Sequence, residues 1–198
     1  DLYTDLETQW VGHPVLDRLP ARREVDPNLY ALLPGSRDQE IQRLRPLFLD
    51  VAHRIRAQQP QAEFLLVGPP PPEIPPPWIR PTPDIADATR ARGALTKAGT
   101  VTLELAVMGV PQVVAHQVHP VTYGLGRMLV QGIRHIAMPN ILAEEPCVPE
   151  YLQQLDADIL ATAVCELPHA QPVPLGALGT PGGARRAAMA VAAAVGMT

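Results

Sequence analysis

The chain has 198 residues, of which 46% are hydrophobic, and a formal net charge of −4. This length suits one large domain or two small ones, each with a real hydrophobic core. The negative charge and the lack of any run of five Lys or Arg argue against a nucleic-acid partner and favour a small molecule. Cys147 and Cys165 have no CxxC spacing, which fits a reducing compartment, so we expect the protein to work in the cytoplasm.

The first half of the chain predicts a strand, a helix and a second strand. The apolar run Leu29–Leu33 is typical of a strand, and the spacing of the apolar residues after it predicts a helix (Ile41, Leu44, Phe48, Val51, Ile55). Ser36 and Gln39 have the spacing of a capping box, so this helix should begin just after Ser36 and close at Pro60. The segment 63–68 predicts the next strand and completes a βαβ unit with parallel strands.

The second half continues the alternation after a proline-rich stretch, Gly68–Pro83, that predicts a stiff extended loop. The expected strands are 94–96, 112–118 and 135–138, and the expected helices are 100–108, 121–130, 156–166 and 183–195. Strands alternating with helices in this way predict an α/β fold with a doubly wound parallel sheet, of the Rossmann-like type.

Two loops that leave strands carry unusual chemistry, and such loops are where open parallel sheets bind ligands. Gly35, Ser36 and Arg37 bring backbone N–H groups, a hydroxyl and a guanidinium to a helix N-terminus, which suits a phosphate. The alternative is a capping box with an Arg37 side chain that faces solvent.

The second such loop is Gly99-Thr100, followed by Glu104 in an otherwise apolar segment. Gly99 allows close approach of a ligand, and Thr100 can cap the helix. A carboxylate in such a segment must be exposed, bonded to helix N–H groups or partnered by a polar ligand such as the two hydroxyls of a ribose. The alternative is an acid that only complements the helix dipole.

The histidines and the remaining motifs narrow the chemistry further. His116 and His119 have an H-x-x-H spacing but no clear third ligand, so we expect no metal site and no cofactor. They could still contact a ligand as neutral groups. The sequence has no GxSxG, P-loop or GxGxxG motif, which argues against serine hydrolases, P-loop NTPases and dinucleotide-binding enzymes.

Five segments together resemble, in order and spacing, the carboxyl-terminal half of the lipid-A-disaccharide synthase family. They are VGHPVLD (11–17), LLPGSRDQEI (32–41), KAGTVTLELA (97–106), PQVVAHQVHPVTY (111–123) and MPNILAEEPCVPEYLQ (138–153). The resemblance implies one of the two Rossmann-like domains of a GT-B glycosyltransferase, the one that binds the UDP part of the donor. Such an enzyme joins UDP-2,3-diacylglucosamine to 2,3-diacylglucosamine 1-phosphate by inverting transfer and releases UDP.

The resemblance also implies roles for particular residues. Gly35, Ser36 and Arg37 would face the diphosphate, Gly99 and Thr100 would line the same cleft, Glu104 would bind the ribose hydroxyls and Asn140 would contact the donor or the interdomain cleft; further candidates are His13, His116 and Thr122. The general base is expected in the preceding half, so no catalytic residue is assigned. We expect this chain alone to bind UDP weakly and to transfer nothing.

The implied organisation is a hinge or remnant of the preceding half at 1–20, a nucleotide-sugar-binding domain at 21–167 and a proline-rich linker with an Ala-rich helix at 168–198. The implied partners are the UDP-sugar donor, a lipid-linked sugar acceptor, the preceding amino-terminal domain and the inner face of the cytoplasmic membrane. Glu144-Glu145 and His116 depart from the pattern of the family. Another GT-B UDP-sugar transferase and a non-catalytic protein that binds a nucleotide sugar therefore stay open as alternatives.

Overall fold

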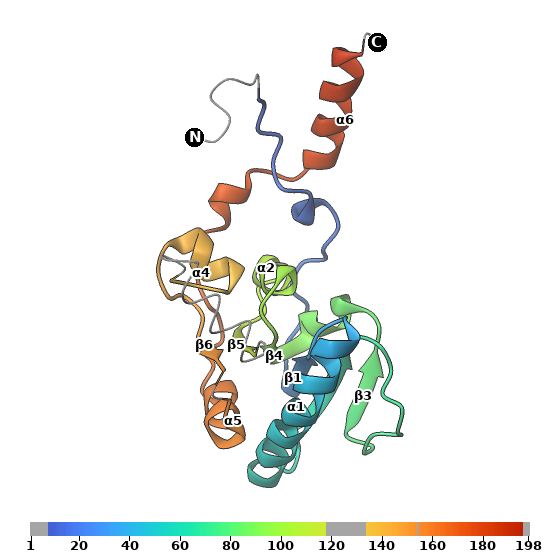
Figure 1. Ribbon diagram of the computed structural model, residues 1–198, viewed down its shortest axis with the longest axis vertical. Helices are drawn as coiled ribbons and strands as arrows, with labels where there is room; N and C mark the ends of the chain where they lie inside the picture. Colours follow the sequence, from blue (N-terminus) through green and yellow to red (C-terminus); the bar gives the residue numbers. More distant parts are fainter. Residues whose placement is uncertain (1–7, 118–133, 154, 196–198) are drawn as a thin grey trace. The chain divides into compact units, whose positions relative to one another are not determined.

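The computed structural model describes residues 8–117, 134–153 and 155–195. The chain divides into two compact units. Pro20–Pro174 form the larger unit, and Asp1–Leu19 with Leu175–Thr198 form the smaller one. The larger unit holds the sheet (Figure 1).

The sheet of the larger unit has six strands in the order β3-β2-β1-β4-β5-β6, and every neighbouring pair is parallel. The strands are β1 (Asp26–Leu33), β2 (Glu63–Val67), β3 (Ile79–Thr82), β4 (Ala91–Thr96), β5 (Gln112–His116) and β6 (Glu150–Leu152). This is the strand order of the Rossmann fold, in which the chain winds outward in both directions from β1 and β4. The prediction of a doubly wound α/β fold is confirmed.

Helices cover both faces of this sheet. On one face α1 (Asp38–Gln58) and α5 (Ala157–Cys165) share a core with Tyr30, Phe64 and Val113. Side chains of neighbouring strand residues point to opposite faces. Gln112 accordingly lies on the other face, where its side-chain N–H donates to the Thr102 carbonyl of α2 (Thr100–Val107), 2.8 Å away.

The short helix α4 (Met138–Ala143) packs on the same face as α2, because the backbone N–H of Met138 donates to the Thr102 hydroxyl at 3.1 Å. Three 3-10 helices and one α-helix complete the described elements. The larger unit holds η2 (Ile85–Arg90), and the smaller unit holds η1 (Pro14–Asp17), η3 (Leu175–Leu178) and α6 (Gly183–Ala194). The predicted helix at 121–130 lies outside the described residues.

The predicted capping box at the start of α1 is wrong. The N-cap is Arg37, in an extended conformation and without a side-chain cap bond, and the helix begins at Asp38. The register is therefore one residue later than the Ser36–Gln39 spacing suggested. The third helical position is Glu40, whose carboxylate binds the Lys97 side chain at 2.7 Å.

Two strands were missed. Part of the proline-rich stretch forms β3, at the edge of the sheet, where Pro81 is tolerated because an edge strand is hydrogen-bonded on one side only. The strand predicted at 135–138 is wrong, since Met138 already begins α4 and Pro139 suits the first turn of a helix. The strand beside β5 is instead β6, whose three residues are too few to show a pattern.

The smaller unit joins the two ends of the described chain. The Asp17 carboxylate accepts hydrogen bonds from the backbone N–H groups of Ala184, at 2.8 Å, and Gly182, at the start of α6, and these bonds hold the pKa of Asp17 below its usual value. The Arg186 guanidinium donates to the Val11 carbonyl at 2.9 Å. Side chains far apart in the sequence therefore hold η1 and α6 together.

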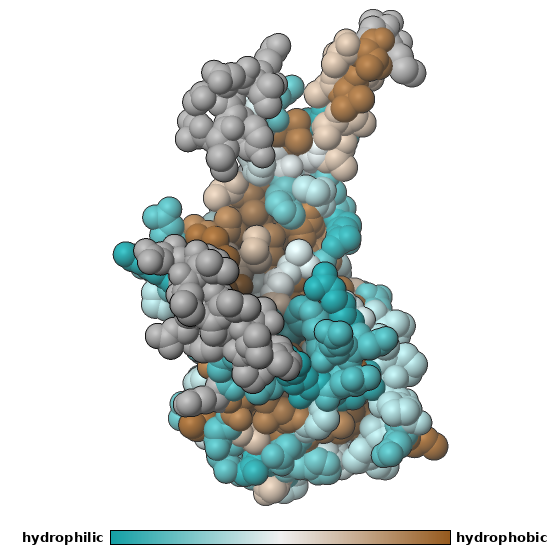
Figure 2. Space-filling model, in the orientation of Figure 1, coloured by the Kyte–Doolittle hydropathy of each residue, from teal (hydrophilic) through white to brown (hydrophobic). Residues whose placement is uncertain are grey.

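The exposed side of α6 is apolar. Met189, Val191 and Val195 are each more than 60% exposed, and α6 shows brown hydrophobic surface in Figure 2. Among the residues that the structure describes, no helix combines the length and the apolar character needed to cross a membrane.

Candidate functional site

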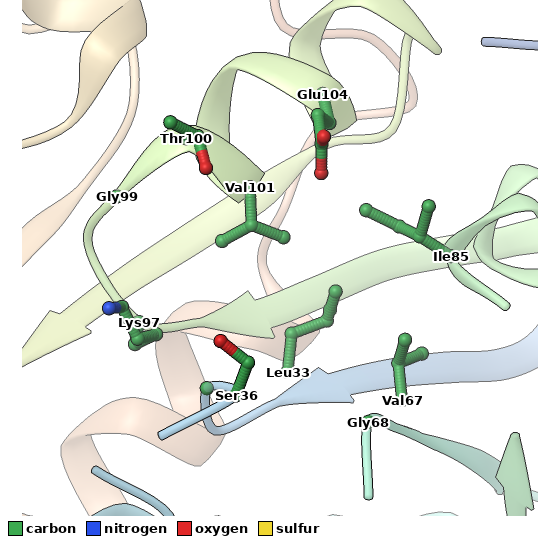
Figure 3. A pocket seen from close by; sticks show the side chains of 11 residues that line it. Leu33, Ser36, Val67, Gly68, Ile85, Lys97, Gly99, Thr100, Val101 and Glu104 are labelled. Atoms are coloured by element: carbon green, nitrogen blue, oxygen red, sulfur yellow. The ribbon is translucent and has the colours of Figure 1, made fainter. Parts of the chain in front are cut away.

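A cavity of about 230 Å³ opens at the carboxyl edge of the sheet. Its walls come from the ends of β1, β2 and β4, from η2 and from the first turns of α2 (Figure 3). The lining residues are Leu33, Gly35, Ser36, Val67, Gly68, Ile85, Lys97, Gly99, Thr100, Val101 and Glu104. The crossovers from β1 and β4 run in opposite directions, and the crevice between such strands is where open α/β sheets bind ligands.

Two glycine turns line this cavity. Gly35 has φ of 122° and Gly99 has φ of 146°, which residues with a Cβ rarely adopt. A Cβ on Gly35 would lie 2.7 Å from Oε2 of Glu40 and 3.0 Å from Cδ of Lys97. One on Gly99 would lie 3.3 Å from Cε of Lys97. Both glycines are therefore needed for their backbone conformation and for the space that the Lys97 side chain fills.

Five of the predicted site residues line this one cavity: Gly35, Ser36, Gly99, Thr100 and Glu104. Ser36 lies beside the end of β1, and Glu104 projects from α2 on the opposite side (Figure 3). Glu104 is half-buried. One detail differs from the prediction, because Gly99 is the N-cap of α2 and Thr100 is already its first helical residue.

Arg37 is not among the lining residues. Its side chain is 84% exposed, and its Nη1 lies 3.6 Å from Oε1 of Glu40. The cation that lines the cavity is Lys97, whose side chain is only 15% exposed. Sequence reasoning missed Lys97, although its place directly after β4, two residues before Gly99, was a usable signal.

Lys97 forms a half-buried ion pair with Glu40, with 2.7 Å between Nζ and Oε1. Burial alone would raise the pKa of Glu40, but the hydrogen bond and positive charge of Lys97, together with the backbone N–H groups of Arg37 and Ser36, lower this pKa on balance. Glu40 is therefore ionised at neutral pH. Its second oxygen, Oε2, is buried and has no hydrogen-bond partner in the described part of the chain.

The structure does not bring Asn140 into this cavity. Asn140 is fully buried, and its side-chain N–H groups donate to the Val148 carbonyl at 2.8 Å and to the Glu150 carboxylate at 2.7 Å. Its carbonyl accepts from the backbone N–H groups of Cys147 and Val148, both at 2.8 Å. These bonds use the whole capacity of the amide, so a donor contact at Asn140 would require this network to open.

His116 lines a neighbouring cavity of about 720 Å³, together with Gly99 and Glu144. Burial, and then the positive charge of Lys97, lower the pKa of His116, so its ring is neutral at pH 7. Its Nδ1 is buried and has no hydrogen-bond partner among the described residues. Glu144, at the end of α4, thus faces this second cavity and is not among the residues that line the first.

The remaining candidates lie elsewhere. His13 belongs to the smaller unit, where its Nδ1 accepts a hydrogen bond from the backbone N–H of Val15 at 3.1 Å at the start of η1. Thr122 and His119 lie outside the described residues.

The family model and the curated relatives that match this chain name the same family. A family model described as lipid-A-disaccharide synthetase matches residues 1–71 and 86–167. Curated relatives named lipid-A-disaccharide synthase include one from Nitrosococcus oceani, 42% identical over 62% of this chain and 34% of its own length. One from Gluconobacter oxydans is 38% identical over 75% of this chain and 41% of its own length. One from Geobacter sulfurreducens is 33% identical over 78% of this chain and 46% of its own length. The chain spans less than half the length of these relatives.

Among solved structures, the crystal structure of the GtfA/B complex matches 76% of this chain and 30% of its own chain, with a TM-score of 0.44 and 11% sequence identity. This likeness is too distant to support a statement about function.

Proposed function

The chain belongs to the lipid-A-disaccharide synthetase family, and we propose that it forms the donor-binding half of an inverting glycosyltransferase of GT-B type. The complete protein would transfer diacylglucosamine from UDP-2,3-diacylglucosamine to 2,3-diacylglucosamine 1-phosphate and release UDP. The preceding amino-terminal domain would bind the lipid-linked acceptor and supply the general base. This reaction would take place in the cytoplasm, with peripheral contact to the inner face of the membrane.

The cavity at the carboxyl edge of the sheet is the observation that carries this proposal. It gathers Ser36, Glu104 and two glycine turns from loops that are more than 60 residues apart in the sequence. The first N–H groups of a helix have no partner within the helix and attract anions, and α2 begins at this cavity. The diphosphate would therefore lie against Gly35 and Gly99, and the ribose hydroxyls would bind Glu104.

This arrangement also suits the chemistry of the transfer. When the acceptor hydroxyl attacks the anomeric carbon, the departing UDP gains negative charge, which fixed N–H dipoles at the helix N-terminus stabilise. The cavity of about 230 Å³ is smaller than a whole nucleotide sugar. Gly99 also lines the neighbouring cavity of about 720 Å³, so the sugar would extend past Gly99 into that space.

The test is a calorimetric titration of UDP into the wild-type chain, Glu104→Gln and the control Glu145→Gln, whose side chain is exposed. Glu104→Gln should weaken UDP binding by about 1–3 kcal/mol, because a charged hydrogen bond to the ribose is lost. The control should bind as the wild type does. With 2′-deoxy-UDP the difference between wild type and Glu104→Gln should shrink, because one of the two hydroxyls is already absent.

A folded wild-type chain that does not bind UDP would contradict this proposal. Equal affinity for UDP, ADP and GDP would point to a nucleotide-sugar protein without uridine selectivity. The two alternatives left open by the sequence would also bind UDP, so other measurements separate them. Another UDP-sugar transferase would prefer a different donor sugar. A non-catalytic protein would bind the donor, but the complete protein would transfer nothing.

A further inference from the structure

The two ionisable side chains in the described lining of the cavity are Lys97 and Glu104. Glu104 lies on α2, whereas the stem of Lys97 lies close to the two glycine turns, where a Cβ on either glycine would crowd it. Arg37, the cation that the sequence favoured, is 84% exposed. A phosphate that entered the turns would therefore meet the Lys97 ammonium group first.

Glu40 holds this ammonium group in an incomplete pair. Its Oε1 lies 2.7 Å from Lys97 Nζ and 3.6 Å from an Arg37 nitrogen, whereas Oε2 is buried without a hydrogen bond in the described chain. A buried carboxylate oxygen without a partner lowers stability, and half-satisfied buried pairs contribute little to it. Stability alone therefore gives a poor account of this pair.

The charges suggest a different role. A lysine is a flexible point charge that can change partners, and a diphosphate carries more negative charge than one carboxylate. The Lys97 stem packs against Gly35 and Gly99, so a small rotation of its end would move Nζ from Glu40 toward the cavity. Glu40 would stay ionised nearby and oppose the incoming anion.

We infer that Lys97 is the cation that binds the diphosphate. In the free protein its ammonium group is paired with Glu40, and it leaves Glu40 for the diphosphate when the ligand binds. This rests on the proposed function of the cavity. Glu40 thereby holds Lys97 in place before binding and lowers the affinity for any anion. The affinity for UDP is set by the competition between one carboxylate and the diphosphate for a single lysine.

UDP titrations of three variants of the whole chain test this inference. Lys97→Met should weaken UDP binding on the order of 10-fold to 100-fold, because a charged hydrogen bond is lost. Glu40→Gln, which keeps the shape and removes the charge, should tighten binding by roughly 3-fold to 10-fold, because a like charge beside the ligand is removed. Arg80→Met is the matched control, since it removes an exposed cation that does not line the cavity, and should change binding less than about 3-fold.

Each outcome decides the inference. A gain of affinity in Glu40→Gln cannot come from misfolding. In the Lys97→Met background the same substitution should gain less affinity, because the lysine for which Glu40 competes is gone. A wild type that binds UDP and a folded Lys97→Met that binds it equally well would overturn the inference but leave the proposed function intact. Weaker binding by Glu40→Gln would also overturn it, because Glu40 would then support the bound lysine. A wild type that does not bind UDP overturns both.

Discussion

Glu40 contacts Lys97 directly after β4, and Asn140 contacts the segment that leads into β6, yet the surroundings of these two polar side chains differ completely. Asn140 donates two hydrogen bonds, accepts two from backbone N–H groups and is fully buried. Glu40 shares one oxygen between Lys97 and Arg37 and leaves the other without a partner in the described chain. The first network is closed, whereas the second lies beside a cavity and has room for another charge.

The difference shows how a structural polar cluster can be told from one that can receive a ligand. Both residues lie in segments that resemble the same family, and sequence alone gave Asn140 a site role and Glu40 none. Complete hydrogen bonding makes a buried network rigid and specific, whereas incomplete bonding beside a cavity is typical of functional sites. Substitutions in the two clusters should therefore affect different properties.

The largest effect is expected for Asn140→Ala. The substitution leaves the Val148 carbonyl, the Cys147 and Val148 N–H groups and part of the Glu150 carboxylate without partners, so unfolding free energy should fall by about 3 kcal/mol. Urea denaturation followed by circular dichroism measures this loss. Below the unfolding transition, UDP affinity should stay close to that of the wild type. Lost UDP binding at unchanged stability would instead give Asn140 a direct contact with the donor.

The next effect is expected for Gly35→Ala. The new Cβ would lie too close to Glu40 Oε2 and Lys97 Cδ, on a backbone with φ of 122°, so unfolding free energy should fall by about 2 kcal/mol. UDP binding should weaken as well, because the pair and the turn both shift. The matched control is Gly176→Ala, whose Cβ meets nothing within 4 Å. Equal urea midpoints for the two variants would contradict the tight packing around Gly35.

The smallest effect concerns pH. The pKa of Glu40 lies below its ordinary value of 4.5 in the folded chain, so the folded state binds fewer protons there than the unfolded state. The stability that Glu40 contributes should be present above about pH 4.5 and be lost as the pH falls through the lower folded pKa. The loss should be at most about 1 kcal/mol, because the pair is partly exposed. In urea titrations, the difference in unfolding free energy between wild type and Glu40→Gln should be present at pH 7 and shrink below about pH 4. A difference that stays the same at both pH values would contradict the lowered pKa of Glu40.

Much of the fold could be predicted because long helices and strands show a recognisable spacing of apolar residues. The apolar stripe of α1 and the runs of β1 and β2 were read correctly, with ends shifted by at most three residues. The edge strand β3 was missed because prolines normally exclude a strand, and β6 because three residues carry no period. The place of Lys97 after β4 could have marked it as a candidate, but its ion pair with Glu40 could not be predicted, since it joins residues 57 positions apart.

The hydrogen bonds that tie Asp17 to the start of α6 have a consequence for the order of folding. Asp17 leaves the ribosome long before Gly182, 165 positions later in the chain, whereas neighbouring elements of the parallel sheet become available between these two times. Loop closure over so many residues is slow, and domains tend to fold as they are synthesised. The segment around Asp17 must therefore wait for α6 to emerge, so the smaller unit assembles only after all strands of the larger unit have been synthesised.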